Sequence, residues 1–66
     1  MFIVTLKLHG ATSFLRGTVW TPASERATRY ATRELAEAAR LAAKQFMVGR
    51  ARLWATSEVE EVLVDG

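Results

Sequence analysis

The strict alternation of residue types at the start of the chain is the feature that most constrains its fold. Every second residue from Phe2 to Leu8 is apolar, and the residues between them are polar from Thr5 onward. Side chains of a strand point alternately to its two faces, so this period of two predicts a strand with one buried face. A buried face needs a cover, which the rest of the chain must supply.

Three further segments are predicted to be strands. Residues 10–13 are typical of a turn and lead into a second strand over residues 14–20, so that the first two strands form a hairpin. Gly17 inside this second strand indicates a bulge or a close approach by other backbone. Residues 50–56 are predicted as a third strand, and residues 59–64 as a fourth strand or a continuation of the third.

An alanine-rich helix is predicted to cover the sheet. At about 100° per residue, one face of residues 32–47 collects six apolar side chains. They are Leu35, Ala38, Ala39, Ala42, Ala43 and Phe46. The alanines would let the helix backbone lie close to the sheet, with Leu35 and Phe46 filling the space at the two ends. Gly49 stands where a left-handed residue would end the helix.

Two alternatives exist for the start of this helix. Thr21 is suited to cap a helix, and Pro22 is suited to its first position, where the missing N–H is harmless. In one alternative the helix then runs unbroken to Met47. In the other, a short helical turn ends near Ala27 and the main helix begins after a second cap at Thr32.

We favour the broken version because of three residues before the main helix. Thr28, Tyr30 and Thr32 are poor helix formers at alternating positions, as in an extended segment. Residues 29–31 are therefore predicted to be extended, and Tyr30 to be largely buried.

The predicted fold is a single α+β domain over residues 1–66. Its order is ββαβ, or ββαββ if the last two strands are separate, with a small, mostly antiparallel sheet and one main helix on one face. A chain of this length buries little surface, so oligomerisation stays open as a way to complete the core. The chain has no run of ~20 apolar residues and its apolar start lacks the basic residues of a signal sequence, so we expect a cytoplasmic protein.

Part of the chain resembles a pattern in short phage and prophage proteins. In that pattern a hairpin ends at Trp-Thr, a short turn carries an Ala, and an extended aromatic segment with Thr or Ser leads into an Ala-rich helix. The matching residues are Trp20, Thr21, Ala27, Tyr30, Ala31, Thr32 and Ala36. The resemblance implies a small ββαβ phage-type protein, a class that includes anti-CRISPR inhibitors. It implies no activity and no binding residue.

No pattern in the sequence points to catalysis or to a metal. The chain has one histidine, His9, and no cysteine, so neither a zinc site nor a disulfide is expected. No serine or carboxylate stands at a spacing typical of a nucleophile and its base. The four glycines are dispersed rather than grouped in a phosphate-binding loop. We therefore expect a protein that is not an enzyme and needs no cofactor.

Two tryptophans are the first candidates for contact with a partner protein. Trp20 shares a face of the predicted second strand with Arg16, and Trp54 shares a face of the predicted third strand with Arg52. Aromatic residues together with arginine are typical of protein interfaces. The alternative is that both tryptophans complete a minor core over this face. Leu41 is a further candidate, because it lies off the apolar helix face among charged residues.

Basic residues indicate nucleic-acid binding as an alternative function. On a continuous helix five of them would form one stripe, namely Arg26, Arg29, Arg33, Arg40 and Lys44. Such a stripe is typical of a surface that follows a phosphate backbone. The structural alternative is an ordinary solvated face in which Glu37 pairs with Arg33 and Arg40. A break in the helix would remove the first two residues from the stripe.

The sequence therefore predicts a small module that binds a host protein or complex, such as a phage- or prophage-encoded modulator or inhibitor of the anti-CRISPR type. Nucleic-acid binding is the alternative, and a homodimer built from exposed sheet faces or edges is a third. The charge is unevenly distributed: eight of the nine Lys and Arg residues lie between Arg16 and Arg52, and four of the seven Asp and Glu residues follow Arg52. Such a division permits pairing within the fold, between copies, or with a partner.

Overall fold

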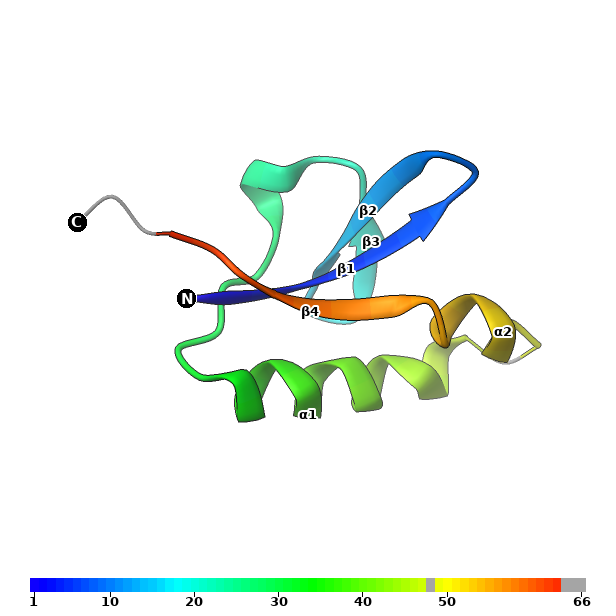
Figure 1. The fold of residues 1–66 in the computed structure, drawn as a ribbon. Coiled ribbons are helices and arrows are strands. Elements are labelled where there is room, and N and C mark those ends of the chain that lie inside the picture. Colours follow the sequence, from blue (N-terminus) through cyan, green and yellow to red (C-terminus); the bar gives the residue numbers. More distant parts are fainter. Residues whose placement is uncertain (48, 64–66) are drawn as a thin grey trace.

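The computed structural model describes residues 1–47 and 49–63, which form a four-stranded antiparallel sheet with one main helix against it (Figure 1). The strands are β1 (Phe2–Leu8), β2 (Ala11–Arg16), β3 (Val19–Thr21) and β4 (Ser57–Glu61), in the spatial order β3-β2-β1-β4. The main helix is α1 (Arg33–Ala43), and the shorter helical segments are η1 (Ser24–Arg26), η2 (Lys44–Phe46) and α2 (Ala51–Trp54). The α+β class and the ββαβ order are confirmed.

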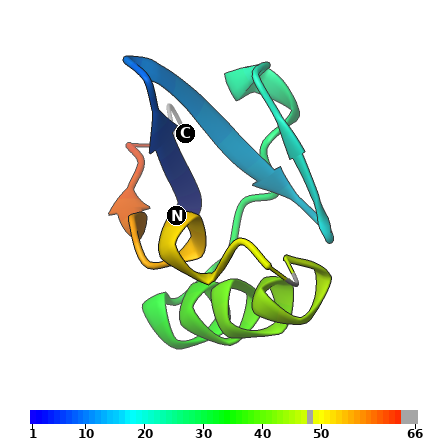
Figure 2. The same cartoon turned by 90° about the vertical axis from the view of Figure 1, so that its right-hand side faces the viewer.

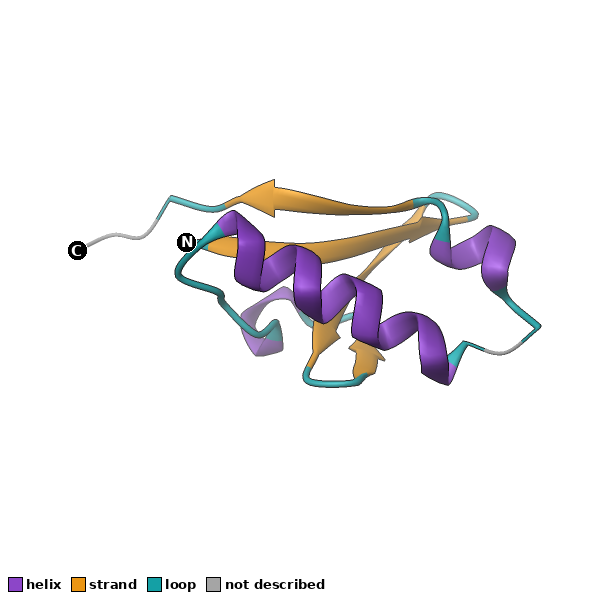
Figure 3. Ribbon diagram, turned by 90° about the horizontal axis from the view of Figure 1, so that it is seen from below, coloured by secondary structure: helices purple, strands orange, loops and turns teal. Residues whose placement is uncertain are grey.

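The interior strand β1 is buried on both faces, not on one face as its alternation predicts. It pairs with β2, where Thr5 lies opposite Phe14, and with β4, where Val4 lies opposite Val59. Helix α1 runs beneath the sheet and η1 lies on its other side (Figure 1), and α1 crosses in front of the strands in Figure 3, which views the molecule from below. Val4 and Thr5, which point to opposite faces, are 0% and 1% exposed. β2 and β3 twist away from β1 (Figure 2).

The break before the main helix is confirmed, and Thr32 caps α1 as predicted. The Thr32 hydroxyl accepts a hydrogen bond from the Leu35 backbone N–H at 3.2 Å. Tyr30 is extended and forms a bridge with Phe2, in which each backbone N–H donates to the other residue's carbonyl, at 2.7 and 2.8 Å. Tyr30 is half-buried against the core. These bonds to β1 take the place of helical bonds, so the helix cannot continue through Tyr30.

The helical turn before this break begins later than predicted. η1 ends at Arg26, next to the expected end at Ala27, but Pro22 lies outside it. Thr21 is the last residue of β3, and its hydroxyl accepts a hydrogen bond from the Ala23 N–H at 3.2 Å. Thr21 therefore stabilises the turn after a strand instead of capping a helix. Threonine hydroxyls favour such turns as well as helix caps.

A tight turn at Gly17 divides the predicted second strand into β2 and β3, so the prediction of one strand over residues 14–20 is wrong. Gly17 has a φ of +62°, a left-handed conformation that glycine adopts without strain. Its N–H donates to the Thr28 hydroxyl at 2.9 Å, which ties the turn to the segment before α1. Because the chain reverses at Gly17, Trp20 pairs directly with Leu15 and lies on the same face of the sheet.

The predicted third strand is also wrong, because most of residues 50–56 form α2. The Trp54 backbone N–H donates to the Arg50 carbonyl at 3.0 Å, which is the bond of a helical turn. Periodicity alone cannot separate a short strand from a single helical turn in so short a run. The last strand, β4, begins at Ser57 and therefore earlier than the predicted residues 59–64. Residue 64 lies outside the described residues.

The buried face of helix α1 is rotated from the predicted one and shares only Ala39 and Ala43 with it. Ala36 and Ala43 are buried, whereas Leu35 is 54% exposed and Phe46 is 67% exposed. The core cluster consists of Val4, Leu15, Ala36 and Ala43, and the residues packed around it are Phe2, Trp20, Tyr30, Ala39 and Val59. Small side chains at the contact let the helix lie close to β1. The same rotation brings Arg40 to β4, where its Nε donates to the carbonyl and the hydroxyl oxygen of Ser57, at 3.1 and 2.7 Å.

Candidate protein-binding surface

Helix α1 and the turn after it leave one apolar side uncovered, which we call the open face. Because α1 buries the side of Ala36 and Ala43, a neighbouring side of the helix turns to solvent. The open face consists of Leu35, Ala38, Leu41, Ala42 and Phe46, all exposed. Leu35, Ala38, Ala42 and Phe46 follow one another at separations of three or four residues, which places them along one side of the helix, and Leu41 lies at the edge of that side. Leu41, which is 62% exposed, lies three residues from Ala38 at the edge of the open face, among charged residues as the sequence predicts.

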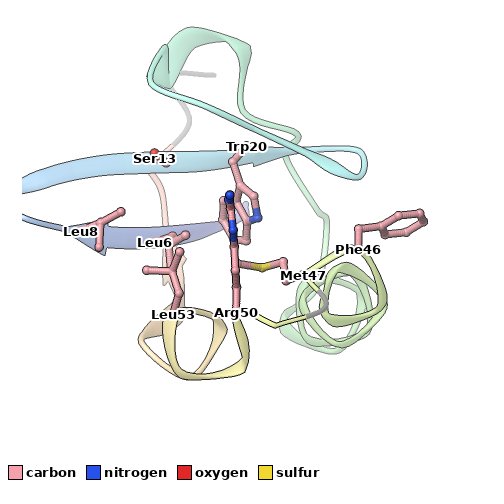
Figure 4. Close-up of a pocket in the computed structure, with 8 residues that line it drawn as sticks. All are labelled: Leu6, Leu8, Ser13, Trp20, Phe46, Met47, Arg50 and Leu53. Atoms are coloured by element: carbon pink, nitrogen blue, oxygen red, sulfur yellow. The ribbon is translucent and has the colours of Figure 1, made fainter.

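A pocket of about 530 Å³ opens where the open face ends (Figure 4). Its volume lies within the range of about 300–1,000 Å³ that is usual for ligand sites. Its walls are formed by Leu6, Leu8, Ser13, Trp20, Phe46, Met47, Arg50 and Leu53. Gly49, with a φ of +81°, is the left-handed residue expected after the helix. The reversal of the chain there places Leu53 beside Leu6 of β1 (Figure 4).

The pocket combines apolar walls with a single charged side chain. Apart from Ser13 and Arg50, all of its lining residues are apolar. The Arg50 side chain extends across the pocket toward Trp20, whereas the Phe46 ring stands at the rim and points away (Figure 4). Within residues 1–47 and 49–63, no carboxylate lies within 4 Å of the Arg50 guanidinium nitrogens. The guanidinium is thus placed to bind an anion beside an apolar group.

Trp20 and Arg16 do not share a face of the sheet, which corrects the geometry predicted for them. Trp20 pairs with Leu15, packs on the core and forms one wall of the pocket. Arg16 is exposed and pairs with Val19 on the other face. The turn at Gly17 causes the difference, because it starts a new strand before Trp20. Contact between Trp20 and a partner stays a prediction, and the pocket is the place where it would occur.

Trp54 is held by contacts within the chain and does not lie on an open sheet face with Arg52. Its indole N–H donates to the Arg40 carbonyl at 2.7 Å. The Arg40 guanidinium carbon lies 4.2 Å from the centroid of the Trp54 ring, and the Lys44 ammonium nitrogen lies 4.8 Å from it. Trp54 therefore ties α2 to α1. Arg52 is exposed on α2, and its predicted partner contact stays untested.

The predicted basic stripe is absent from the described residues, because the helix break removes two of its members. Arg26 lies in η1, and Arg29 lies in the extended segment before α1. The Arg33 guanidinium carbon is 5.2 Å from the centroid of the Phe2 ring. The other two basic residues of the stripe pack on Trp54, as described above. Cations that rest on aromatic rings of their own chain are less free to follow a phosphate backbone.

Most of the pocket and the open face could not be found from the sequence. Leu35 and Phe46 are predicted to be core residues, and Leu53 lies in a segment predicted to be a strand. One sequence signal does point to the open face. Apolar residues occupy more than one side of the helix, since Leu41 lies away from the predicted core face. A helix that covers one sheet buries one side, so an excess of apolar residues indicates a second contact surface.

Comparison with protein-family models, with curated proteins and with solved structures finds no match for this chain. Over residues 1–47 and 49–63, no helix is both long and apolar enough to cross a membrane. Those residues also contain no group of three or more His, Cys, Asp or Glu side chains placed to hold a metal ion.

Proposed function

We propose that this chain is a small, non-enzymatic, cytoplasmic module that binds a protein partner through the open face of α1 and the adjoining pocket. One observation carries the proposal: Leu35, Leu41 and Phe46 are 54–67% exposed on α1 and on the turn η2 that follows it. Apolar side chains that gather on a surface beside a pocket are typical of sites where proteins interact. A few large apolar or aromatic residues contribute most of the binding free energy at such sites.

The resemblance to short phage and prophage proteins supports a narrower form of this proposal. In that form the module is a phage- or prophage-encoded modulator that binds a larger host complex, an inhibitor of the anti-CRISPR type being one instance. Such a module acts by occupying a surface that the host complex needs, so it requires no catalytic group of its own.

Affinity capture with a matched pair of variants tests the proposal. Phe46→Ser removes a side chain that is 67% exposed on the open face, and Val19→Ser removes one that is 64% exposed on β3. Both variants should unfold within about 0.5 kcal/mol of the wild type, because exposed side chains contribute little to stability. We expect wild type and Val19→Ser to retain the same protein from a bacterial lysate, and Phe46→Ser to lose it. Mass spectrometry identifies the retained protein.

The retained protein is then purified and its affinity is measured directly by calorimetry. Loss of a central apolar anchor costs 2 kcal/mol or more, so Phe46→Ser and Leu41→Ser should each weaken binding by about 30-fold. Equal affinities for wild type and both open-face variants would contradict the proposal. So would an equal loss in Val19→Ser, because that residue lies on the other face of the sheet.

A further inference from the structure

We propose that the pocket accepts a partner segment in which a large apolar side chain is followed by a carboxylate. The apolar side chain fills the pocket, and Arg50 binds the carboxylate at its mouth. This inference rests on the proposed function, since it names the chemistry of the partner at the same surface.

The floor of the pocket selects the apolar part of the segment. Leu6 and Met47 are buried, 4% and 7% exposed, whereas Leu8 at the edge of the pocket is 44% exposed. An apolar side chain placed over this floor removes its own surface and that of the leucines from water, which is favourable in proportion to the area covered. A volume of about 530 Å³ leaves room for one large side chain and for the backbone that carries it.

The charge of the pocket selects the carboxylate. Arg50 is the one charged residue among its lining residues, and Ser13 adds a hydroxyl that can donate to the same anion. A guanidinium matches a carboxylate with two parallel N–H donors, whereas a lysine in the partner would meet a like charge. Arg52, which lies on α2 two residues after Arg50, adds a second positive charge near this end of the molecule. The site is therefore complementary to an acidic segment.

The occupant is a protein segment because the pocket and the open face share a residue. Phe46 lines the pocket and also ends the open face, so a chain that fills the pocket continues onto Phe46 and the neighbouring part of the open face. A free carboxylate with an apolar tail would fill the pocket but leave the open face in water. A protein segment covers both surfaces at once.

Peptide titrations followed by amide NMR shifts test the inference. The probes are capped hexapeptides, acetyl-Gly-Ser-Leu-X-Ser-Gly-amide, in which X is Glu, Gln or Lys. We expect shifts at Leu6, Leu8 and Leu53, with dissociation constants in the millimolar range. The Glu peptide should bind about two- to five-fold more tightly than the Gln peptide, which is the range of an exposed ion pair. The Lys peptide should bind most weakly, and replacing the Leu by Ala should abolish the shifts.

Two arginine variants show whether Arg50 is the residue that causes the preference for the Glu peptide. Arg50→Gln should remove the preference for Glu over Gln while leaving binding of the Gln peptide unchanged. Arg52→Gln is the matched control, because Arg52 lies only two residues from Arg50, is exposed and does not line the pocket, and it should keep the preference.

Four outcomes would overturn the inference. Equal affinity for the Glu and Lys peptides would show that the pocket does not recognise a carboxylate. An unchanged preference for Glu in Arg50→Gln would show that Arg50 does not bind it. Hexanoate binding as tightly as the Glu peptide shows that no protein segment is needed. A dimer in sedimentation at the peptide-titration concentration, with the pocket residues at its interface, makes a second copy the occupant. The first three outcomes would not contradict the proposed function, because it depends on partner capture by Leu41 and Phe46.

Discussion

Arg40 and Trp54 form the contact that fixes the end of the molecule around α2. The Arg40 guanidinium stacks on the Trp54 ring and its Nε also donates to Ser57, while its carbonyl accepts the indole N–H of Trp54. A single arginine thus joins α1 to α2 and to the first residue of β4. These contacts favour the alternative in which Trp20 and Trp54 stabilise the fold rather than bind a partner, although the two residues pack in different places.

Replacement of Trp54 separates the contribution of its N–H from that of its ring. Trp54→Phe keeps an aromatic ring but leaves the Arg40 carbonyl without this donor, so we expect a loss of about 1 kcal/mol in the free energy of unfolding. Trp54→Ala also removes the packing and the two cation contacts, and should cost about 2–4 kcal/mol. Urea denaturation measures both, with Arg52→Ala as an exposed control within about 0.5 kcal/mol of wild type. An unchanged stability in Trp54→Ala would instead support the partner-binding role predicted from the sequence.

At the scale of elements, the orientation of α1 about its axis decides which residues can bind a partner. The helix carries alanines on two neighbouring sides, and either side alone would fit against a sheet. The observed orientation buries Ala36 and Ala43 and exposes Ala38 and Ala42. It also lets Arg40 reach Ser57, a contact that the predicted orientation would have lost.

Two alanine-to-leucine variants two residues apart test this orientation. Ala36 is 0% exposed, so Ala36→Leu forces a larger side chain between α1 and the sheet and should cost about 1–3 kcal/mol. Ala38 is exposed on the open face, so Ala38→Leu should change stability by less than about 0.5 kcal/mol. Both keep helix propensity nearly constant, which makes each the control for the other. The opposite order of stabilities in thermal unfolding would restore the face predicted from the sequence.

At the scale of the whole molecule, the charges are arranged mainly for the fold. Glu37 lies 3.9 Å from Arg40, as in the solvated-face alternative, and the basic residues of α1 rest on aromatic rings. The acidic residues Glu58, Glu60 and Glu61 lie on β4, which is an edge strand of the sheet. Charged side chains along an edge disfavour its pairing with the edge of another copy, so this edge is a poor site for a homodimer.

This arrangement predicts weak binding to nucleic acid. Exposed arginines such as Arg26 and Arg29 give some attraction to phosphates, but they are not continued by the basic residues of α1. We expect dissociation constants above the micromolar range for DNA and RNA near 0.15 M salt, where charges more than about 8 Å apart are screened. Fluorescence anisotropy across a salt series measures both the affinity and the number of phosphates contacted. Sub-micromolar binding at this salt concentration, lost in an Arg26→Gln, Arg29→Gln double variant, would make nucleic acid the principal partner.

The sequence by itself determined the local features of this protein. The strand from Phe2 to Leu8, the extended segment at Tyr30, the cap at Thr32 and the left-handed Gly49 are all observed. Each depends on the backbone preferences of residues that are neighbours in the chain, so the information needed to predict it is local. The α+β class follows from the same features, because one-sided strands and an amphipathic helix must cover one another.

Only the tertiary structure decided which faces meet, and therefore where the candidate site lies. The left-handed Gly17 permits a turn as readily as a bulge, and the turn was selected by the bond from Gly17 to Thr28, a residue distant in sequence. The choice between the two alanine sides of α1 depended on the fit of Ala36 to the sheet and on the contact of Arg40 with Ser57. The pocket joins side chains from β1, β3 and α2 that no local pattern relates to one another, because long-range packing brings them together.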